Sequence, residues 1–305
     1  MLKQRVNEAE IALAISTVTP LLIKAGDTGA DPTRPDMEFV QTYRGGQETI
    51  YIPGSSLKGA FRSHAERIIR TIGGSSPGRT FWACDPLDHK GPCHTGAKGK
   101  DFPEVYKGLC FACRTFGCMQ AASHVTIADA YPKHDTRLQL EERNGVAIDR
   151  RLGSVAVGPF NYQVASIATF ETTIRLVNFS LDQLGLLALV VRDFDRQQVS
   201  LGFSKSRGLG QVAMQVARVA IRYPACVLAD NKISCGNKNF EADKIIGAGD
   251  LMQDPARYGF PTPDQVRVPC SAALDKLGFG VLQQVAREDA DELWSRCVER
   301  WAAKV

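Results

Sequence analysis

Residues 49–62, Thr-Ile-Tyr-Ile-Pro-Gly-Ser-Ser-Leu-Lys-Gly-Ala-Phe-Arg, place an apolar strand end before a Pro-Gly turn and the start of a helix. Ser55 and Ser56 can cap this helix, and Lys58 and Arg62 lie one helical turn apart. The first N–H groups of a helix lack partners within it, so backbone donors, hydroxyls and two cations gather here. We therefore predict phosphate contacts from Gly54, Ser55, Ser56, Lys58 and Arg62. The alternative is an ordinary amphipathic helix with solvated cations.

A second basic segment that contains glycines, Lys205-Ser-Arg-Gly-Leu-Gly210, precedes the last predicted core strand. Glycines let backbone N–H groups approach a phosphate closely, and two cations add charge. A Gly-x-Gly sequence alone is also typical of a turn that binds nothing. Because this segment and residues 49–62 can meet on one face of a sheet, we predict further contacts from Lys205, Arg207, Gly208 and Gly210.

The composition is that of a globular protein. The chain has 305 residues, of which 44% are apolar and 23% charged, with a net charge of +4. This length suits two domains or one domain with large insertions, and the charge permits nucleic-acid binding without arguing for it. The first residues lack the apolar core of a signal peptide, and the apolar run at 186–191 is too short to span a bilayer. We expect a soluble, cytoplasmic protein with no membrane partner, and nothing in the sequence calls for ATP or a flavin.

The periodicity of apolar residues predicts an α+β fold. Strands are expected near 8–18, 125–131, 166–177 and 210–221, and helices near 56–72 and 180–194. The order β-α-β-β-α-β is that of a ferredoxin-like or RNA-recognition-motif-like core, which we assign to residues 1–223. Residues 75–120 and 133–165 are predicted insertions, the second a long hairpin that leaves the core. Residues 224–305 are a predicted extension, an irregular stretch with a closing helix near 286–303, whose apolar stripe (Leu293, Cys297, Trp301) predicts an internal or subunit-docking face.

The cysteines predict a structural zinc site. Cys110 and Cys113 have the two-residue gap that lets both thiolates face one ion, and Cys84 and Cys93 precede them in the same insertion. Four thiolates in a tetrahedron would fold the insertion rather than perform chemistry. Cys118, His89 and His94 are spare candidates. We expect no disulfides, and we interpret Cys226, Cys235, Cys270 and Cys297 as core or surface thiols.

Taken together, "YIPGSSLKGAFRSHAE" (51–66), "LCFACRTFGC" (109–118) and "GFSKSRGLGQV" (202–212) resemble the RAMP superfamily, and more narrowly the backbone subunits of type III CRISPR effector complexes. The segment "GVAIDRRLGSVAVGPF" (145–160) resembles the thumb hairpin of that family, and the resemblance covers roughly residues 8–222. It implies a protein that coats CRISPR RNA in a filament with neighbouring backbone subunits and other effector subunits. In the thumb, it implies backbone contacts from Arg150 and Arg151 and a wedge between bases formed by one of Val155, Val157, Pro159 or Phe160.

The resemblance also implies cleavage of paired target RNA by an aspartate in the loop before "IPGSS". Asp36 is the first candidate, and Asp27 and Asp31 share its loop. A carboxylate beside the scissile phosphate can hold Mg²⁺ or Mn²⁺ while the 2′-hydroxyl of the RNA attacks. Acidic residues beside proline and glycine are also ordinary turn formers, which leaves a scaffold without nuclease activity as the alternative. A guide-processing endoribonuclease that uses His64, with Lys58 and Tyr51 nearby, or an unrelated zinc-bearing RNA-binding protein, is less favoured.

Overall fold

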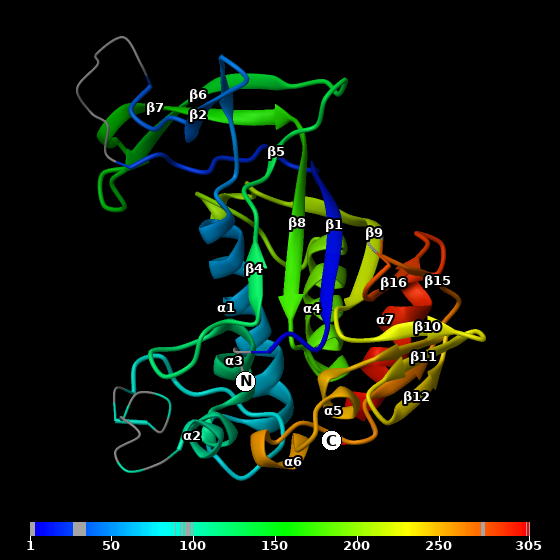
Figure 1. The fold of residues 1–305 in the computed structure, drawn as a ribbon. Coiled ribbons are helices and arrows are strands. Elements are labelled where there is room, and N and C mark those ends of the chain that lie inside the picture. The colour runs from blue at the N-terminus through cyan, green and yellow to red at the C-terminus, as the bar shows by residue number, and fades with distance from the viewer. Residues whose placement is uncertain are drawn as a thin grey trace.

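A seven-stranded sheet forms the centre of the molecule (Figure 1). The computed structural model describes residues 4–26, 35–88, 90, 91, 93, 95, 99, 101–275, 278–302 and 304. The strands of this sheet are β1 (Glu8–Thr17), β4 (Val125–Ile127), β5 (Tyr131–Pro132), β8 (Thr169–Val177), β9 (Val212–Tyr223), β15 (Ser271–Leu274) and β16 (Val281–Val285). Their order is β15-β16-β9-β1-β8-β4, with β5 also paired to β8, and every pairing is antiparallel.

Strand β1 lies at the centre of the sheet because its apolar residues alternate as a one-sided strand requires. Ile11, Leu13 and Ile15 are buried, whereas the residues between them are partly exposed. Ile11 lies opposite Ile174 of β8 on one side and Val219 of β9 on the other. The molecule is thus a mixed α+β protein built on a large antiparallel sheet.

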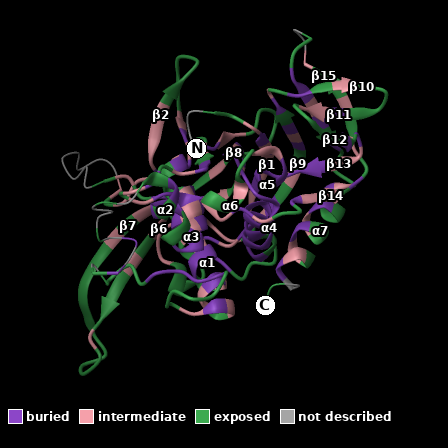
Figure 2. Ribbon diagram, turned by 60° about the horizontal axis from the view of Figure 1, so that its bottom comes forward, coloured by how far each residue is buried: buried purple, intermediate pink, exposed green. Residues whose placement is uncertain are grey.

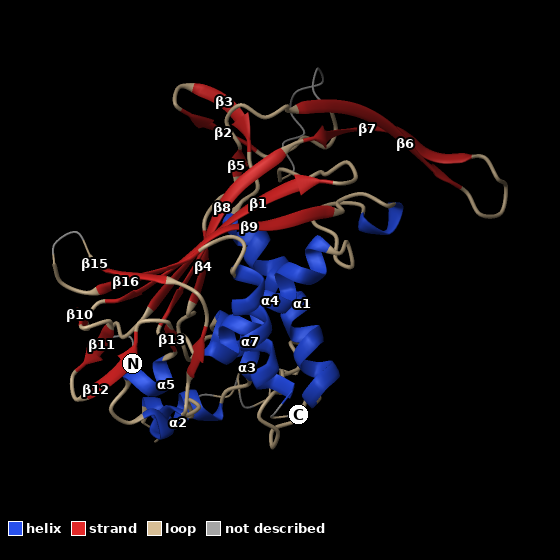
Figure 3. Ribbon diagram, turned by 90° about the vertical axis from the view of Figure 1, so that its right-hand side faces the viewer, coloured by secondary structure: helices blue, strands red, loops and turns tan. Residues whose placement is uncertain are grey.

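Three helices cover one face of the sheet, α1 (Gly54–Gly73), α4 (Leu181–Asp195) and α7 (Ala290–Ala302), as Figure 3 shows. Helix α1 buries Leu57, Phe61, Ala65 and Ile69 at helical spacing. Helix α4 is capped by Ser180, which forms a capping box with Gln183. The other face of the sheet carries no helix in the described part of the chain.

Helix α7 packs against α4 and closes the core. The backbone carbonyl of Cys297 would lie 2.9 Å from a Cβ at Gly185, so only a glycine permits this close approach. The indole Nε1–H of Trp301 donates to the Asp182 carbonyl at 3.0 Å, and Leu293 is fully buried. The apolar stripe of α7 is therefore an internal face.

Two hairpins project from one end of the sheet. The longer pairs β6 (Gln139–Ile148) with β7 (Val155–Ile167), where the long hairpin was expected, and the shorter pairs β2 (Gln41–Arg44) with β3 (Gln47–Ile50). Figure 2 shows that most of the long hairpin is exposed. At the opposite end of α1, the insertion carries the short helices α2 (Phe102–Gly108) and α3 (Phe111–Phe116) (Figure 1).

The C-terminal region is more regular than the sequence predicted. Its strands β15 and β16 extend the central sheet beside β9. The remaining elements are β10 (Val227–Ala229), β11 (Lys232–Cys235), β12 (Lys238–Glu241), β13 (Lys244–Ile246), α5 (Ala248–Leu251), α6 (Pro255–Tyr258) and β14 (Gln265–Arg267). Strands β10 to β12 form a three-stranded sheet, and β13 pairs with β14. These strands are too short for their alternation to be recognised from the sequence.

The expectation of no disulfides was wrong at one pair, because Cys226 and Cys235 are bonded. Val227 of β10 pairs with Ser234 of β11, and this register places the two cysteines opposite each other at the mouth of the hairpin. Spacing alone does not reveal such a pairing. Within the described residues, no helix has the length and apolar character needed to cross a membrane.

Candidate nucleic-acid interface and cysteine cluster

Helix α1 and the glycine-containing segment before β9 meet in a pocket of about 460 Å³. Ser56, Gly59 and Ser63 line it from α1, whereas Gly202, Phe203 and Lys205 line it from the other side. We call this the α1–loop pocket, after residues 56–63 and 201–205. The structure thus brings together the two basic segments that the sequence singled out.

Close backbone contacts hold residues 201–210 against the segment that follows β1. The Phe203 N–H donates to the Leu22 carbonyl at 2.8 Å, and the Gly210 N–H donates to the Pro20 carbonyl at 2.9 Å. Gly202 has φ +74°, and a Cβ there would lie 2.2 Å from the Leu22 oxygen. Gly202 and Gly210 therefore position the loop, and the buried Gly210 N–H is already occupied. Gly208 has open space around it.

Two cations of this loop, Lys205 and Arg207, are exposed. The guanidinium of Arg207 lies 5.7 Å from the ring centre of Phe203 and 6.0 Å from that of Phe160 in β7. Lys205 borders the α1–loop pocket. In the described part of the chain, neither side chain forms an ion pair, so their charge is available to an anion. Arg207 also joins the loop to the middle of the long hairpin.

The start of α1 differs from the expectation of free N–H groups and a serine cap. The Gly54 N–H donates to the Asp129 carboxylate at 2.7 Å, and the N–H groups of Ser56 and Leu57 fold back onto the Pro53 carbonyl. Pro53 is the N-cap residue, so Asp129, from the β4–β5 connection, replaces the expected serine cap. Gly54 is required because a Cβ there would lie 2.1 Å from the Ile127 oxygen.

The two cations of α1 have different surroundings. Lys58 is half-buried near the pocket end of the helix, and burial together with the charge of Arg62 lowers its pKa. Arg62 instead donates through Nη1 to the Gly117 carbonyl at 3.0 Å and through Nε to Glu66 at 2.9 Å. The hydroxyls of Ser55 and Ser56 are on exposed residues. Of the predicted phosphate contacts on this helix, the Gly54 N–H and the Arg62 side chain are committed to protein groups.

Asp36 lies against the middle of the long hairpin. Its Oδ2 accepts a hydrogen bond from the Asn161 N–H at 2.8 Å, and the backbone of Met37 bonds to β7 on both sides, at 3.2 and 2.9 Å. The residue is exposed, and Oδ1 has no protein partner among the described residues. Asn161 follows Phe160, whose ring faces Arg207. Asp36 therefore shares one end of the molecule with the pocket. Asp27 and Asp31 lie outside the described residues.

The tip of the long hairpin combines cations with exposed apolar side chains. Asp149 accepts from the N–H groups of Arg151 and Leu152 at 2.7 and 2.8 Å, which shapes the turn. Arg150 and Arg151 are both exposed. Leu152 is 77% exposed and Val157 64%. Exposed apolar side chains of this size are typical of a surface that another molecule covers.

Four cysteines from the insertion form a buried cluster. The sulfur atoms of Cys84, Cys93, Cys110 and Cys113 all lie within 4.8 Å of one another. The Sγ atom of Cys84 is 3.7 Å from those of Cys110 and Cys113. A zinc–sulfur bond of about 2.3 Å places the corners of a tetrahedron about 3.8 Å apart, so this group could hold a structural metal ion such as zinc.

Backbone N–H groups around the cluster point to its sulfur atoms. The Cys110 N–H points to Cys93 Sγ and the Cys113 N–H to Cys110 Sγ, both at 3.3 Å. Hydrogen bonds shared among the four thiols lower the pKa of Cys110 and raise the pKa of Cys93 and Cys113. The thiol of Cys113 likewise lowers the pKa of the nearby Cys118 to about 6. The spare candidates His89 and His94 lie outside the described residues.

His64 lies between α1 and α4. Its Nε2 is 2.7 Å from Asp193 Oδ2, and Asp193 also pairs with Arg192 at 2.7 Å. Tyr51, which the same alternative required, stacks on Tyr131 with ring centres 5.8 Å apart. Each of the two residues thus has a partner within the protein, and the His64 side chain is only 12% exposed.

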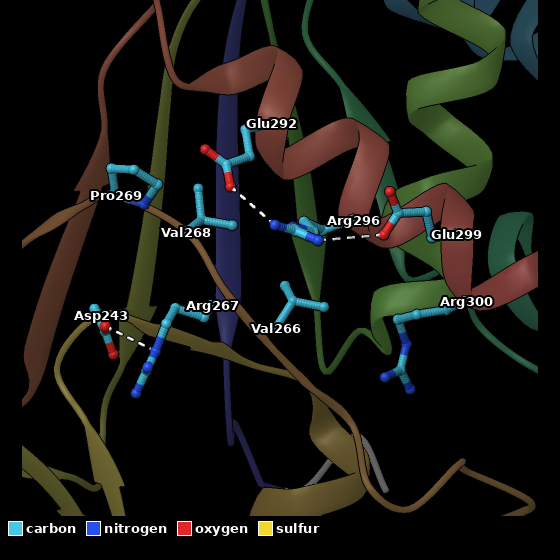
Figure 4. Close-up of a pocket in the computed structure, with 9 residues that line it drawn as sticks. All are labelled: Asp243, Val266, Arg267, Val268, Pro269, Glu292, Arg296, Glu299 and Arg300. Atoms are coloured by element: carbon cyan, nitrogen blue, oxygen red, sulfur yellow. Dashed lines mark hydrogen bonds and ion pairs between the residues drawn. The ribbon is translucent and has the colours of Figure 1, made fainter.

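A larger pocket of about 810 Å³ lies between β14 and α7 (Figure 4). Arg267 pairs with Asp243 at 2.9 Å, and Arg296 pairs with Glu292 at 3.5 Å. Because carboxylates neutralise these cations, this pocket suits an anionic strand less well than the α1–loop pocket.

Sequence reasoning missed Asp129, Ser63 and Phe203, which position or line the interface. Asp129 lies two residues after the strand 125–127, and a carboxylate near a strand end is the one signal that could have suggested a cap. Ser63 and Phe203 line the pocket only because α1 and the loop at 201–205, which are far apart in the sequence, pack together in the fold.

A protein-family model described as RAMP superfamily matches residues 14–213. The match includes the α1–loop pocket, the long hairpin and the four clustered cysteines. No curated protein matches the chain.

Proposed function

Because this chain belongs to the RAMP superfamily, we propose that it is a CRISPR RNA-binding backbone subunit of a type III interference complex. The observation that carries this proposal is the α1–loop pocket, where two basic segments far apart in the sequence line one cavity. Such a subunit would work in the cytoplasm beside neighbouring backbone subunits and other effector subunits. Its partners would be the guide RNA and the paired target RNA.

We propose a ferredoxin-like core within residues 1–223, with residues 224–305 as an extension. The order β9-β1-β8-β4, with α1 and α4 on one face, supports this assignment. Four antiparallel strands in this order are what a β-α-β-β-α-β chain forms when its two helices pack together. The hairpin β6–β7 would be the thumb of this core.

In the proposed binding mode, the protein holds the phosphate backbone and leaves the bases free to pair. Lys205, Arg207 and Lys58 would supply charge, and the hydroxyls of Ser55 and Ser56 would donate hydrogen bonds. Contacts of this type fix a strand without reading its sequence, as variable guides require. Arg150 and Arg151 of the hairpin tip would contact the strand farther along. The helix N-terminus would contribute little, because Asp129 already occupies the Gly54 N–H.

The salt dependence of RNA binding tests this mode. Each lost phosphate contact lowers the slope of log K against log salt by about one. We therefore expect the double substitution K205Q/R207Q to lower the slope by about two, equally for unrelated RNA sequences, as measured by fluorescence anisotropy. The control is K232Q, an exposed lysine of β11 outside the proposed interface. Equal slopes for K205Q/R207Q and K232Q would contradict the proposed mode.

We further propose that the loop containing Asp36 cleaves the target RNA. The 2′-oxygen would form a bond to the adjacent phosphorus while the bond from phosphorus to the 5′-oxygen breaks. The 2′-hydroxyl proton passes to solvent, and the departing 5′-oxygen takes up a proton from it. A divalent cation held by the carboxylate, Mg²⁺ or Mn²⁺, would supply charge neutralisation at the phosphate. Asp27 and Asp31 are alternative ligands, and a scaffold without cleavage is the second candidate function.

Substitution of Asp36 tests cleavage separately from binding. We expect D36A to abolish metal-dependent cutting, measured on a labelled target, while guide binding and its salt slope are unchanged. D36N is the matched control for structure, because its amide oxygen can still accept the Asn161 N–H although the charge is lost. Both variants should lose cleavage. Undiminished cutting by D36N would exclude the carboxylate charge from the mechanism and direct attention to Asp27 and Asp31.

We also propose that Cys84, Cys93, Cys110 and Cys113 hold a structural Zn²⁺. The spacing of their sulfur atoms and their burial support this. When bound, the ion would fix the insertion to the end of α1.

A further inference from the structure

One charged row of α1 faces the cysteine cluster. Arg62, Glu66 and Arg70 follow one another at intervals of four residues, and so share one face of the helix. Glu66 binds both arginines, at 2.9 Å from Arg62 and 2.8 Å from Arg70. Its side chain is only 11% exposed. A carboxylate buried to this degree is stable when it is paired on both sides.

Both arginines also reach the segments that carry the cysteines. Arg62 Nη2 lies 3.6 Å from Cys113 Sγ, and Nη1 of the same side chain donates to the Gly117 carbonyl at 3.0 Å. Arg70 Nη2 donates to the Cys84 carbonyl at 3.0 Å. The Sγ atoms of Cys84 and Cys113 are themselves 3.7 Å apart. The row therefore holds the two ends of the insertion on one helix.

We propose that Arg62, Glu66 and Arg70 are positioning residues of the cysteine metal centre, with Arg62 as a hydrogen-bond donor to the Cys113 thiolate. This inference rests on the metal site proposed above, and it assigns Arg62 to the metal rather than to RNA. Four thiolates around a divalent ion carry a net charge of −2. A guanidinium beside one sulfur offsets part of this charge, and its fixed fork orients the ligand.

The geometry explains why a glutamate lies between the arginines. Glu66 lies one helical turn from each arginine, so a single carboxylate pairs with both guanidinium groups and fixes both side chains. With Nε on Glu66, Nη1 on Gly117 and Nη2 on Cys113, Arg62 directs each of its three nitrogens to the protein. Lys58, one turn earlier, has no such partner among the described residues and remains the α1 cation available to a phosphate.

Two measurements on the full-length protein separate the metal role of Arg62 from an RNA role. The first is the rate at which zinc passes to a chromogenic chelator, and the second is the salt slope of RNA binding. Loss of a partner that orients a metal ligand costs about 10- to 100-fold in metal affinity. We therefore expect R62Q and R70Q to release zinc at least about tenfold faster than the unmodified protein, with an unchanged salt slope. K58Q should show the reverse, a lower slope and unchanged zinc release.

R67Q is the matched control, because Arg67 is an exposed arginine on the same helix. It should leave both measurements unchanged. R62K keeps the positive charge but lacks the planar guanidinium, so it should release zinc at a rate between those of R62Q and the unmodified protein. This variant provides the test if R62Q does not fold. The ligand-field absorption of Co²⁺-substituted R62K should also shift, because the Cys113 thiolate loses its oriented donor.

The outcomes that overturn the inference are distinct from those that overturn the proposed function. Zinc release from R62Q at the normal rate, with a salt slope lowered by about one, would make Arg62 an RNA contact and leave the proposed function intact. Protein that contains no metal by elemental analysis would end the metal role of all three residues. RNA binding that does not vary with salt concentration and is unchanged in K58Q would instead contradict the proposed function.

Discussion

At the start of α1, the protein supplies its own anion. The carboxylate of Asp129 accepts the Gly54 N–H, in the position where a helix N-terminus would otherwise attract a phosphate. In the proposed binding mode, phosphate contacts would therefore depend on side-chain cations and hydroxyls. This makes Lys58, Lys205 and Arg207 more important to affinity than the glycines around them, and Gly54 and Gly210 are explained by close backbone approach alone.

At the same scale, His124 makes stability depend on pH. The side chain is buried, its Nδ1–H donates to the Val177 carbonyl at 2.6 Å, and its Nε2 accepts from the Tyr106 hydroxyl at 2.9 Å. Burial lowers its pKa to about 4, below the value of about 6.5 in an unfolded chain. The unfolded state thus binds more protons between these values. The contribution of neutral His124 to the free energy of unfolding is complete above pH 6.5. As the pH falls from 6.5 toward 4, up to about 3 kcal/mol of this contribution is lost.

We expect the free energy of unfolding, measured by urea denaturation at several pH values, to fall over this interval in the unmodified protein. In H124N the free energy of unfolding should fall by up to about 3 kcal/mol less, because asparagine does not titrate. H134N is a suitable control, since His134 is 94% exposed. An identical pH dependence in H124N and the unmodified protein would show that His124 does not contribute.

At the scale of elements, the sequence predicts best where periodicity is long and one-sided. Ile11, Leu13 and Ile15 of β1, and Leu57 and Phe61 of α1, follow patterns that only a half-buried strand or helix satisfies. The spacing of Cys110 and Cys113 similarly restricts where their thiols can point. Elements of this kind were located to within a few residues.

Short elements were missed because their environment, not their own pattern, stabilises them. Gln283 of β16 is fully buried, and it is satisfied by the Tyr223 hydroxyl at 2.7 Å and the Ala242 carbonyl at 2.8 Å. A glutamine in a strand looks exposed until these partners are placed beside it. For the same reason the Cys226–Cys235 bond and the turning of Arg62 toward the cysteines depend on tertiary register, which local spacing does not encode.

At the scale of the molecule, α1 connects the two sites. Its first turns line the α1–loop pocket, and its later turns carry the arginine row that holds the cysteine cluster. Helix α1 has 20 residues and extends about 30 Å (Figure 1). The pocket is lined by α1 residues 56–63 and the row runs from Arg62 to Arg70, so the two sites adjoin near the middle of the helix and extend from there toward its two ends.

This arrangement predicts how chelation acts on RNA binding. Removal of zinc by a strong chelator should lower the unfolding temperature by several degrees, because the free energy of metal binding is part of the free energy of folding. RNA affinity should fall as α1 loses its anchor, whereas the salt slope should keep its value, since the phosphate contacts lie elsewhere. Reloading with Zn²⁺ should restore both quantities, and C270S, whose thiol lies outside the cluster, should respond to the chelator as the unmodified protein does. A salt slope that falls with the metal would mean that the cluster itself contacts the RNA, and the separation of the two sites along α1 would then be wrong.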